Sequence, residues 1–340
     1  MRVRPHRLDE SRDEGQSIPP TMRAVVFDEP GAASVMRIAT VPVPVPVMDE
    51  VLIRVTAAGI NPIDAKTRAG RGVSAHLSAL PGTLGFDVAG VVVKTPYELH
   101  PLPVGTRVFG MVAYPRTPGS YAEYAIASTS SLAVIPDSMS DTDAAAVPLA
   151  ALTAWQAVVD IALAHQGSRI LVHAGAGGVG HLAVQFARHM GAHVTATASG
   201  ANVSWLRELG ADVVIDYSTT RFEEVIGTVD IVIDLVGNVT ERTGSRSLQV
   251  LRQGGLLVQV PTGSWPEYAA EAAEARVRAT SMKVIPDGQT LATIGRLLAE
   301  GNVRINVSQV FPLADARRAH AVLEEGHTRG KLVLSMAEPA

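Results

Sequence analysis

Two kinds of hydrophobic pattern alternate along the second half of the chain. Residues 170–173 begin with three consecutive apolar side chains, as in a short strand buried on both faces. The next apolar residues follow a helical spacing and form one face: Val179, Leu182, Ala183, Phe186, Ala187 and Met190. Similar segments predict strands at 193–197, 212–216, 230–234 and 256–260, and helices at 202–209 and 240–252. This alternation predicts a parallel sheet with helices on both faces.

The turn between the first of these strands and its helix is rich in glycine, with Gly175, Gly177, Gly178 and Gly180. A strand, a glycine turn and a helix form the first half of a dinucleotide-binding unit, because glycine allows a tight turn and a close approach to a pyrophosphate. The helix start offers free N–H groups to the phosphates. A plain glycine loop is the alternative. The predicted cofactor contacts in this turn and at later strand ends are Gly175, Ala176, Gly177, Gly178, Val179, Leu235, Val236, Val260 and Pro261.

The first part of the chain has shorter apolar segments separated by Gly and Pro, at 21–27, 50–57, 85–94, 107–113 and 120–127. This pattern predicts a mostly β domain with barrel-like packing. The Val-Pro repeat at 41–47 predicts an extended connector, because proline cannot donate to a strand ladder. A last group of segments, at 288–301, 313–325 and 331–335, is expected to return to this domain.

Composition narrows the class of protein. The chain has 340 residues, of which 47% are hydrophobic and 18% charged, as expected for a globular enzyme long enough for two domains. Its net charge of −4 gives no reason to expect nucleic acid or an anionic membrane as a partner. The longest apolar run, residues 144–164, is interrupted by polar residues and predicts a buried helix rather than a membrane span.

Cysteine is absent, which excludes disulfides, a cysteine nucleophile and a thiolate zinc site, and fits a cytoplasmic location. Residues 1–20 mix basic and acidic side chains with almost no apolar period, so they predict a disordered tail. The acidic residues in this tail argue against a targeting peptide.

Several motifs occur in one order along the chain: AAGINPIDAKTRAG (57–70), PGTLGFDVAGVV (81–92), VGTRVFG (104–110), GSYAEYA (119–125), AAAVPLAALTAWQAV (144–158), HAGAGGVG (173–180), LGADVVIDY (209–217) and EEGHTRGKLVL (324–334). With these motifs the chain resembles the zinc-independent medium-chain dehydrogenase/reductases, in the quinone oxidoreductase (ζ-crystallin-like) branch. The resemblance covers essentially everything after about residue 21.

This resemblance implies an α/β fold. A GroES-like, partly open β-barrel catalytic domain would comprise residues 21–141 and 284–340. A Rossmann domain with a doubly wound parallel sheet would comprise residues 142–283 and bind NADP(H). The cofactor would lie in the cleft between them. A homodimer is also expected, because the later Rossmann strands would expose a sheet edge.

The chain departs from the zinc-dependent relatives of this family. Those enzymes hold zinc with a cysteine early in the barrel and a His-Glu pair after a glycine. Here the corresponding stretches read Gly59-Ile60-Asn61-Pro62 and Gly85-Phe86-Asp87. Neither contains cysteine or histidine, so we expect no zinc.

The loop after the second Rossmann strand indicates which nicotinamide cofactor is bound. NAD sites usually carry Asp or Glu about 20 residues after the glycine turn, whereas residues 197–202 contain no carboxylate. Ser199 and Asn202 are able to donate hydrogen bonds to a 2′-phosphate, and Tyr217 matches a family tyrosine near that phosphate. These residues predict NADPH, with NADH tolerated because no Arg or Lys lies between His193 and Arg207. As an alternative, Ser199 simply caps a helix.

The resemblance also implies residues that act on the substrate side. Asn61 would orient the nicotinamide or the acceptor carbonyl, although Asn-Pro is also a common turn dipeptide. Lys66 stands where several relatives have tyrosine, and is either a polarising ammonium or a solvated surface lysine. Further predicted contacts are Thr153 and Lys331 with the cofactor, and Tyr114, Tyr121 and Trp265 with the acceptor. Thr153 bonding to its own helix backbone, and aromatic rings serving only as packing, are the alternatives.

The resulting hypothesis is a metal-independent, NADPH-dependent oxidoreductase that transfers a hydride to a quinone, enone or enoyl acceptor. A first alternative is a pathway-specific reductase or cyclase of natural-product synthesis, because pocket residues and not the cofactor frame select the substrate. A second is a nucleotide-binding scaffold protein without turnover.

Overall fold

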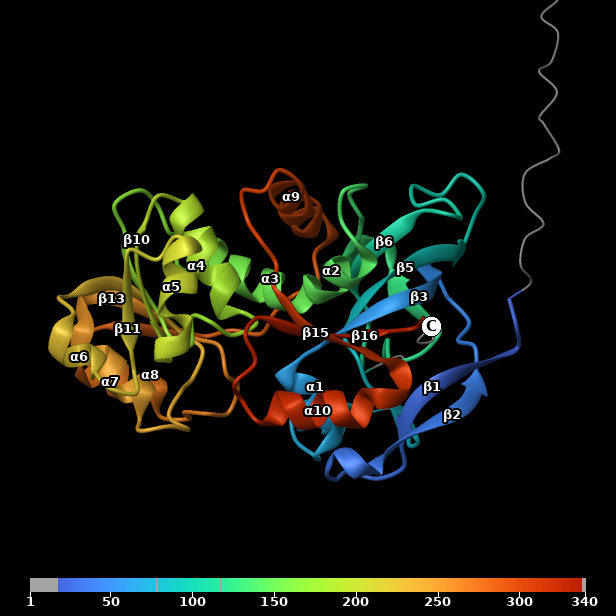
Figure 1. The fold of residues 1–340 in the computed structure, drawn as a ribbon, viewed down its shortest axis with the longest axis horizontal. Helices are drawn as coiled ribbons and strands as arrows, with labels where there is room; N and C mark the ends of the chain where they lie inside the picture. Colours follow the sequence, from blue (N-terminus) through green and yellow to red (C-terminus); the bar gives the residue numbers. More distant parts are fainter. Residues whose placement is uncertain (1–17, 78, 116–117, 338–340) are drawn as a thin grey trace, which may run out of the picture.

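The computed structural model describes residues 18–77, 79–115 and 118–337. The predicted disordered tail therefore lies outside the described residues as far as position 17. The described chain forms two domains side by side, one around a single sheet and the other around two (Figure 1). The first and last parts of the chain share one domain, and the middle forms the other.

The middle of the chain folds around a parallel sheet in the order β11-β10-β9-β12-β13-β14. Its strands are β9 (Arg169–Val172), β10 (His193–Ala198), β11 (Val213–Asp216), β12 (Val229–Asp234), β13 (Leu251–Gln259) and β14 (Arg278–Ser281). The helices between them lie on opposite sides of the sheet (Figure 1): α4 (Gly180–His189), α5 (Val203–Glu208), α6 (Phe222–Val225), α7 (Thr243–Ser247) and α8 (Tyr268–Glu274). The strand order reverses between β9 and β12, which is where such sheets bind their ligands.

The other domain contains two sheets. The larger has the order β15-β16-β3-β5-β6-β8, with β7 also paired to β3, and the smaller has the order β2-β1-β4. The strands are β1 (Thr21–Phe27), β2 (Met36–Pro42), β3 (Glu50–Ile60), β4 (Gly82–Thr83), β5 (Asp87–Lys94), β6 (Arg107–Met111), β7 (Tyr124–Ser128), β8 (Leu132–Val134), β15 (Val307–Pro312) and β16 (Lys331–Ser335). Leu332 of β16 pairs with Ile60 of β3, so the last strand of the chain completes the first domain. Together with the Rossmann sheet, this is the predicted α/β fold.

The predicted buried helix at 144–164 is a series of short helices at the junction of the domains: α2 (Asp141–Ala146), α3 (Pro148–Trp155) and a π-helix (Gln156–Ile161). The break before Pro148 follows from the missing proline N–H. The remaining helices are α1 (Pro62–Arg68), α9 (Gly288–Ala299) and α10 (Ala316–Glu324). Within the described ranges, no helix is long and apolar enough to cross a membrane.

Two predicted elements differ from the structure. The helix predicted at 240–252 ends as α7 at Ser247, and β13 begins at Leu251 instead of residue 256. A 3-10 turn at Leu248–Val250 continues α7, and Leu251 then packs in the Rossmann core as the first residue of the strand. The Val-Pro connector also begins within a strand, because β2 reaches Pro42 and pairs with β1.

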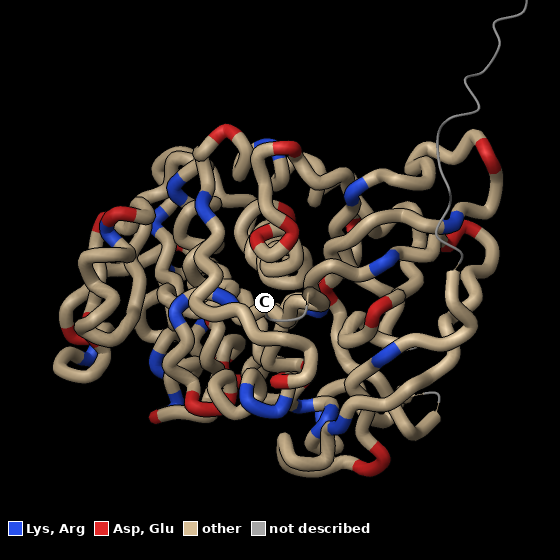
Figure 2. The backbone as a smooth tube through the Cα atoms, turned by 45° about the vertical axis from the view of Figure 1, so that its right-hand side comes forward, with Lys and Arg blue, Asp and Glu red and all other residues tan. Residues whose placement is uncertain are grey.

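Acidic and basic residues are interspersed along the chain, and both signs occur in both domains (Figure 2). This distribution matches the small net charge of −4.

Candidate cofactor cleft and catalytic loop

The residues predicted to contact the cofactor lie on loops that follow five strands of the Rossmann sheet. The glycine turn follows β9, and Ser199 with Asn202 follows β10. Tyr217 follows β11, while Leu235 and Val236 follow β12, and Val260 and Pro261 follow β13. Because the strands are parallel, all these loops meet at the carboxyl edge of the sheet. The structure therefore brings these predicted cofactor residues to one edge, whereas Asn61, Thr153 and Lys331 lie on other elements.

The glycine turn is shaped by close backbone approaches. A Cβ atom on Gly180 would lie 2.1 Å from the Ala174 carbonyl oxygen, which only glycine avoids without a shift of the backbone. Gly175 donates its N–H to the Thr197 carbonyl at 2.8 Å and so fixes the turn to β10. Gly177 and Gly178 are only half-buried. A small, partly open turn at the start of a ten-residue helix fits a dinucleotide pyrophosphate.

An arginine that the sequence reasoning missed lies against the loop predicted to bind the 2′-phosphate. Arg329 Nε donates to Asn202 Oδ1 at 2.7 Å, and Nη2 donates to the Ala201 carbonyl at 3.1 Å. Its guanidinium also lies over the Trp205 ring, 5.1 Å from the centroid. Asn202 in turn donates to the Ser199 hydroxyl at 3.0 Å. Residues 194–206 contain no Arg or Lys, but the fold brings a cation to this loop from 127 positions away.

A buried polar cluster joins both ends of the chain close to this turn. Lys331 Nζ donates to the Ile60 carbonyl at 2.9 Å and to the Asn61 side-chain oxygen, and it lies 3.6 Å from Asp87 Oδ2. Asn61 Nδ2 donates to the same Asp87 oxygen at 2.8 Å. Burial raises the pKa of Asp87, and the Lys331 ammonium opposes that shift. We shall call Asn61, Asp87 and Lys331 the junction cluster.

The fold explains why these three side chains meet. Asn61 follows β3, Asp87 begins β5 and Lys331 begins β16, and these strands are neighbours in the order β16-β3-β5. All three side chains are at most 3% exposed. The stem of Lys331 also packs on the glycine turn, since a Cβ on Gly178 would lie 3.1 Å from Lys331 Cδ. The junction cluster is thus in direct contact with the predicted cofactor turn.

Asn61 and Asp87 occupy the stretches in which zinc-dependent relatives hold their metal. Here the amide and the carboxylate bind each other and an ammonium. Over residues 18–77, 79–115 and 118–337, no three His, Cys, Asp or Glu side chains are placed to hold a metal ion. This donor set does not fit Zn²⁺, which prefers thiolate, imidazole and carboxylate ligands.

The other predicted residues have varied positions. Thr153 is buried and donates its hydroxyl to the Leu149 carbonyl at 2.6 Å, as in the backbone-bonded alternative. Lys66 is half-buried on α1, and burial together with the charge of Arg71 lowers its pKa. Tyr114 is 6% exposed, and its ring packs edge-on against Phe86.

Tyr121 and Trp265 are both deeply buried. The Tyr121 hydroxyl lies 3.2 Å from Asp64 Oδ2 and is directed into the interior of the barrel domain. Trp265 lies in the Rossmann core, and its indole N–H donates to Glu271 at 3.0 Å. The structure therefore does not bring Trp265 together with the junction cluster.

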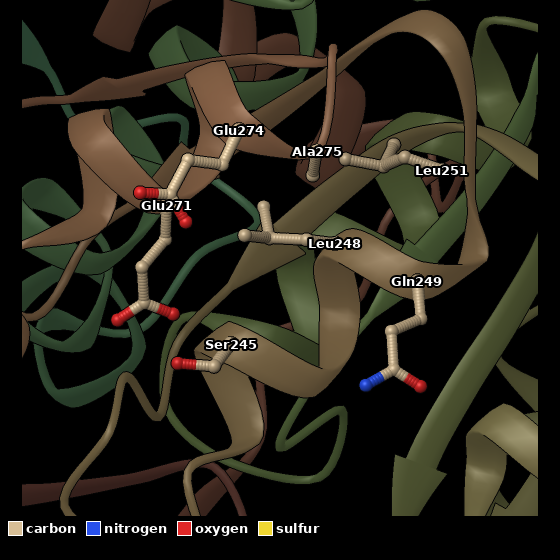
Figure 3. A pocket seen from close by; sticks show the side chains of 7 residues that line it. All are labelled: Ser245, Leu248, Gln249, Leu251, Glu271, Glu274 and Ala275. Carbon is tan, nitrogen blue, oxygen red and sulfur yellow. The ribbon is translucent and has the colours of Figure 1, made fainter.

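A surface pocket of about 410 Å³ lies between α7 and α8 (Figure 3). Its lining includes Glu271, Glu274 and Leu251. Leu251 is the first residue of β13, so this pocket lies toward the amino ends of the strands. It is separate from the edge where the predicted cofactor residues gather.

Comparisons with known proteins agree with this geometry. Residues 48–137 match the family model described as an alcohol dehydrogenase GroES-like domain, and residues 209–334 match the one described as a zinc-binding dehydrogenase. The chain is 35% identical to the 2-methylene-furan-3-one reductase of Solanum lycopersicum and 34% identical to the chloroplastic NADPH-dependent alkenal/one oxidoreductase of Arabidopsis thaliana. Each alignment spans 328 residues and covers 94% of this chain and 80% of the relative.

The solved structure of the quinone oxidoreductase from Coxiella burnetii is 38% identical to this chain, with a TM-score of 0.88. The match covers 93% of this chain and 100% of that one. The two domains and the site between them define an oxidoreductase of the medium-chain dehydrogenase/reductase class. Within that class, the chain belongs to the zinc-independent quinone oxidoreductase family.

Proposed function

We propose that this protein is a metal-independent reductase that uses NADPH to reduce a quinone, an enone or an enoyl compound. The observation that carries the proposal is the contact between the glycine turn and the junction cluster, made by Lys331. It places a dinucleotide-binding turn beside a buried amide and ammonium. The similarity to an alkenal/one oxidoreductase and to a quinone oxidoreductase supports the acceptor class.

When bound, the reduced nicotinamide supplies the hydride. The chain itself would bind the cofactor and orient the acceptor. Backbone N–H groups at the start of α4 would hold the pyrophosphate. Asn61 has its amide orientation fixed by Asp87 and Lys331, and it keeps one N–H free to position a carbonyl. Lys66 would polarise the acceptor oxygen as a partly desolvated ammonium.

We also propose that Arg329 makes the protein prefer NADPH over NADH. Its guanidinium is exposed and lies beside Ser199 and Asn202, and a guanidinium binds phosphate through charge-assisted hydrogen bonds. Tyr217 is 57% exposed at the end of the neighbouring strand and would lie along the adenosine. Bonds of this kind contribute about 1.5–3 kcal/mol, which corresponds to roughly 10- to 150-fold in affinity.

The test of activity is NADPH oxidation, followed by absorbance, with a set of quinones and enones in the presence of a chelator. We expect turnover with at least one class of acceptor and no loss of rate on chelation. Tight NADPH binding without any turnover would favour the scaffold alternative. Turnover with one specialised intermediate alone would favour the pathway-specific reductase.

The test of cofactor preference is calorimetric titration of Arg329→Ala with NADPH and with NADH. We expect NADPH affinity to fall about tenfold or more and NADH affinity to stay within about twofold. Arg37→Ala is the control, because that exposed arginine lies on the barrel domain and pairs with Asp28 at 2.7 Å. Equal losses for both cofactors would contradict a 2′-phosphate role.

We further propose a cytoplasmic homodimer. β14 is an edge strand of the Rossmann sheet, and pairing with a second copy would satisfy its free backbone groups. Sedimentation at micromolar concentration tests this assembly, and a monomer would contradict it. Fractionation of the cells that make the protein tests the location.

A further inference from the structure

Besides the junction cluster, a second network of buried polar side chains begins at Asp64, three residues after Asn61, and extends into the barrel domain. Asp64 Oδ2 lies 3.2 Å from the Tyr121 hydroxyl, which lies 3.2 Å from His320 Nε2. His320 Nδ1 lies 3.0 Å from Arg68 Nη1, and Arg68 pairs at 2.6 Å with Glu324 at the surface. Asp64, Tyr121, His320 and Arg68 are each no more than 1% exposed. The proposed roles of the cofactor turn and the junction cluster do not explain why these four polar side chains are buried.

The hydrogen bonds of this network have a fixed direction. Arg68 can only donate, so His320 Nδ1 accepts and Nε2 carries the ring proton. His320 then donates to the Tyr121 oxygen, and Tyr121 donates its own hydrogen to Asp64. Burial and the charge of Arg68 lower the pKa of His320 to about 3, so the ring stays neutral. Because arginine does not release protons in proteins, the network holds Asp64 in place but brings it no proton from the surface.

The charges around Asp64 favour a protonated carboxyl group. Asp64 and Asp87 are both buried near the Lys331 ammonium. Lys331 forms its ion pair with Asp87, at 3.6 Å, and not with Asp64. Burial raises the pKa of Asp64 to about 7. The hydrogen bond from the Asn61 backbone N–H lowers this pKa, and the charge of Asp87 raises it further. Asp64 Oδ1 is buried and has no hydrogen-bond partner among the described residues. Oδ2 of Asp64 is therefore held by hydrogen bonds, whereas Oδ1 is available to carry a proton.

Tyr114 presents a second available polar atom. Its hydroxyl is buried and also lacks a partner within the part of the chain that the structure describes. Its ring lies 4.9 Å from that of Phe86, centroid to centroid, and Phe86 packs against the cores of both domains. Burial, and then the charge of Asp64, raise the pKa of Tyr114 well above its usual range. Tyr114 thus lies at the domain junction, within electrostatic reach of Asp64.

We propose that Asp64 stores the proton for the reduction and that Tyr114 passes it to the acceptor. This inference rests on the proposed function. When a hydride adds to the β carbon of an enone, an enolate remains. The Tyr114 hydroxyl gives its hydrogen to the α carbon. One water between Asp64 Oδ1 and Tyr114, two atoms without a partner among the described residues, passes the proton of Asp64 back to Tyr114. Asp64 is left as a carboxylate that accepts from the Asn61 N–H, at 2.9 Å, and from Tyr121. Water restores its proton after the product leaves, so NADPH and one proton are consumed per saturated ketone.

The test compares two acceptors in one variant. Asp64→Asn keeps the size of the side chain and its acceptor oxygen but has no transferable O–H proton. With an enone, kcat is expected to fall by about 10²- to 10³-fold, as for loss of a general acid. With a quinone, whose reduced oxygens take protons from water, kcat is expected to change less than about threefold on the same reasoning. Tyr114→Phe is expected to show the same split.

The pH profile provides a second readout. Asp64 acts only while it is protonated, so kcat for the enone is expected to fall as the pH rises through about 7, the pKa of Asp64. The quinone rate is expected to lack this limb. Asp160→Asn and Tyr268→Phe are matched controls, because Asp160 is exposed and the Tyr268 hydroxyl bonds to Ser281 on the Rossmann domain.

Two outcomes would overturn the inference. Equal losses with both acceptors would show that Asp64 is only structural, and unchanged enone turnover would show that the proton comes from elsewhere. If the unmodified protein reduced neither acceptor while still binding NADPH, the proposed function itself would fail and this inference with it.

Discussion

The glycine turn and the junction cluster are built in different ways. β9, the glycine turn and α4, on the proposed cofactor side, follow one another without interruption in the chain. On the other side, the junction cluster is assembled from three strands, and Lys331 reaches Asn61 across 270 positions. A local motif holds its geometry through its own backbone, whereas an assembled cluster depends on the packing of the whole domain. The cofactor side should therefore tolerate remote changes better than the junction cluster does.

The largest effect is expected from Lys331→Met, which keeps a long apolar stem but removes the ammonium. Asp87 would then lose its buried counter-ion, and breaking such a pair costs about 3–5 kcal/mol of unfolding free energy. Chemical denaturation measures this loss. Lys283→Met, at an exposed position, is the control and should change stability by less than about 0.5 kcal/mol.

A second variant sharpens this result. Adding Asp87→Asn to Lys331→Met removes both charges, so the double variant should be more stable than Lys331→Met alone. If the double variant were less stable, the lysine would act through packing rather than through charge.

An intermediate effect on stability is expected from changes in the glycine turn. Gly180→Ala would place a Cβ 2.1 Å from the Ala174 carbonyl oxygen, and such overpacking costs about 1–3 kcal/mol. In Gly177→Ala the nearest atom is the same oxygen at 3.3 Å, so stability should stay nearly unchanged. Instead, NADPH binding should weaken, because the new methyl group occupies the face that a pyrophosphate approaches. Thermal denaturation and NADPH titration of both variants separate the two roles, and identical behaviour of the pair would refute this division.

The smallest effect is expected at the contact between Arg329 and Trp205. Arg329 lies over one face of Trp205, and the His181 ring is stacked with the same indole at 6.0 Å between centroids. Trp205→Leu keeps an apolar side chain but removes a cation–π contact of about 0.5–1 kcal/mol. NADPH affinity should weaken by roughly two- to fivefold, while NADH affinity stays unchanged. A larger loss for NADH than for NADPH would show that Trp205 acts elsewhere.

The sequence predicts those parts of the protein whose pattern is local. The strand at 331–335 and the glycine turn with its helix lie where the hydrophobic spacing places them. The same spacing fails from Leu251 onward, because tertiary packing in the Rossmann core places that residue in a strand. Arg329 could not be found by examining residues 193–207, since its place beside Asn202 depends on how the last strand returns.

The network from Asp64 to Arg68 was also beyond prediction from the sequence. His320 and Tyr121 are 199 positions apart, and neither lies in a metal-like or catalytic spacing. Among the motifs of the chain, AAGINPIDAKTRAG includes Asp64 and Arg68, and GSYAEYA includes Tyr121, but none includes His320. A signal was present in α10, because His320 lies on the same buried face as Ala316 and Ala319.

The short segment Arg329–Gly330–Lys331 contacts the loop after β10, the glycine turn and the loop after β3, through Asn202, Ala176 and Asn61. Because ribosomes make the amino-terminal end first, every other part of this cleft exists before that segment does. A nascent chain therefore cannot assemble the complete site until its final strand has emerged. Synthesis itself thus sets the order of events, and an incomplete chain that stops before residue 329 would carry the glycine turn without the residues that close it.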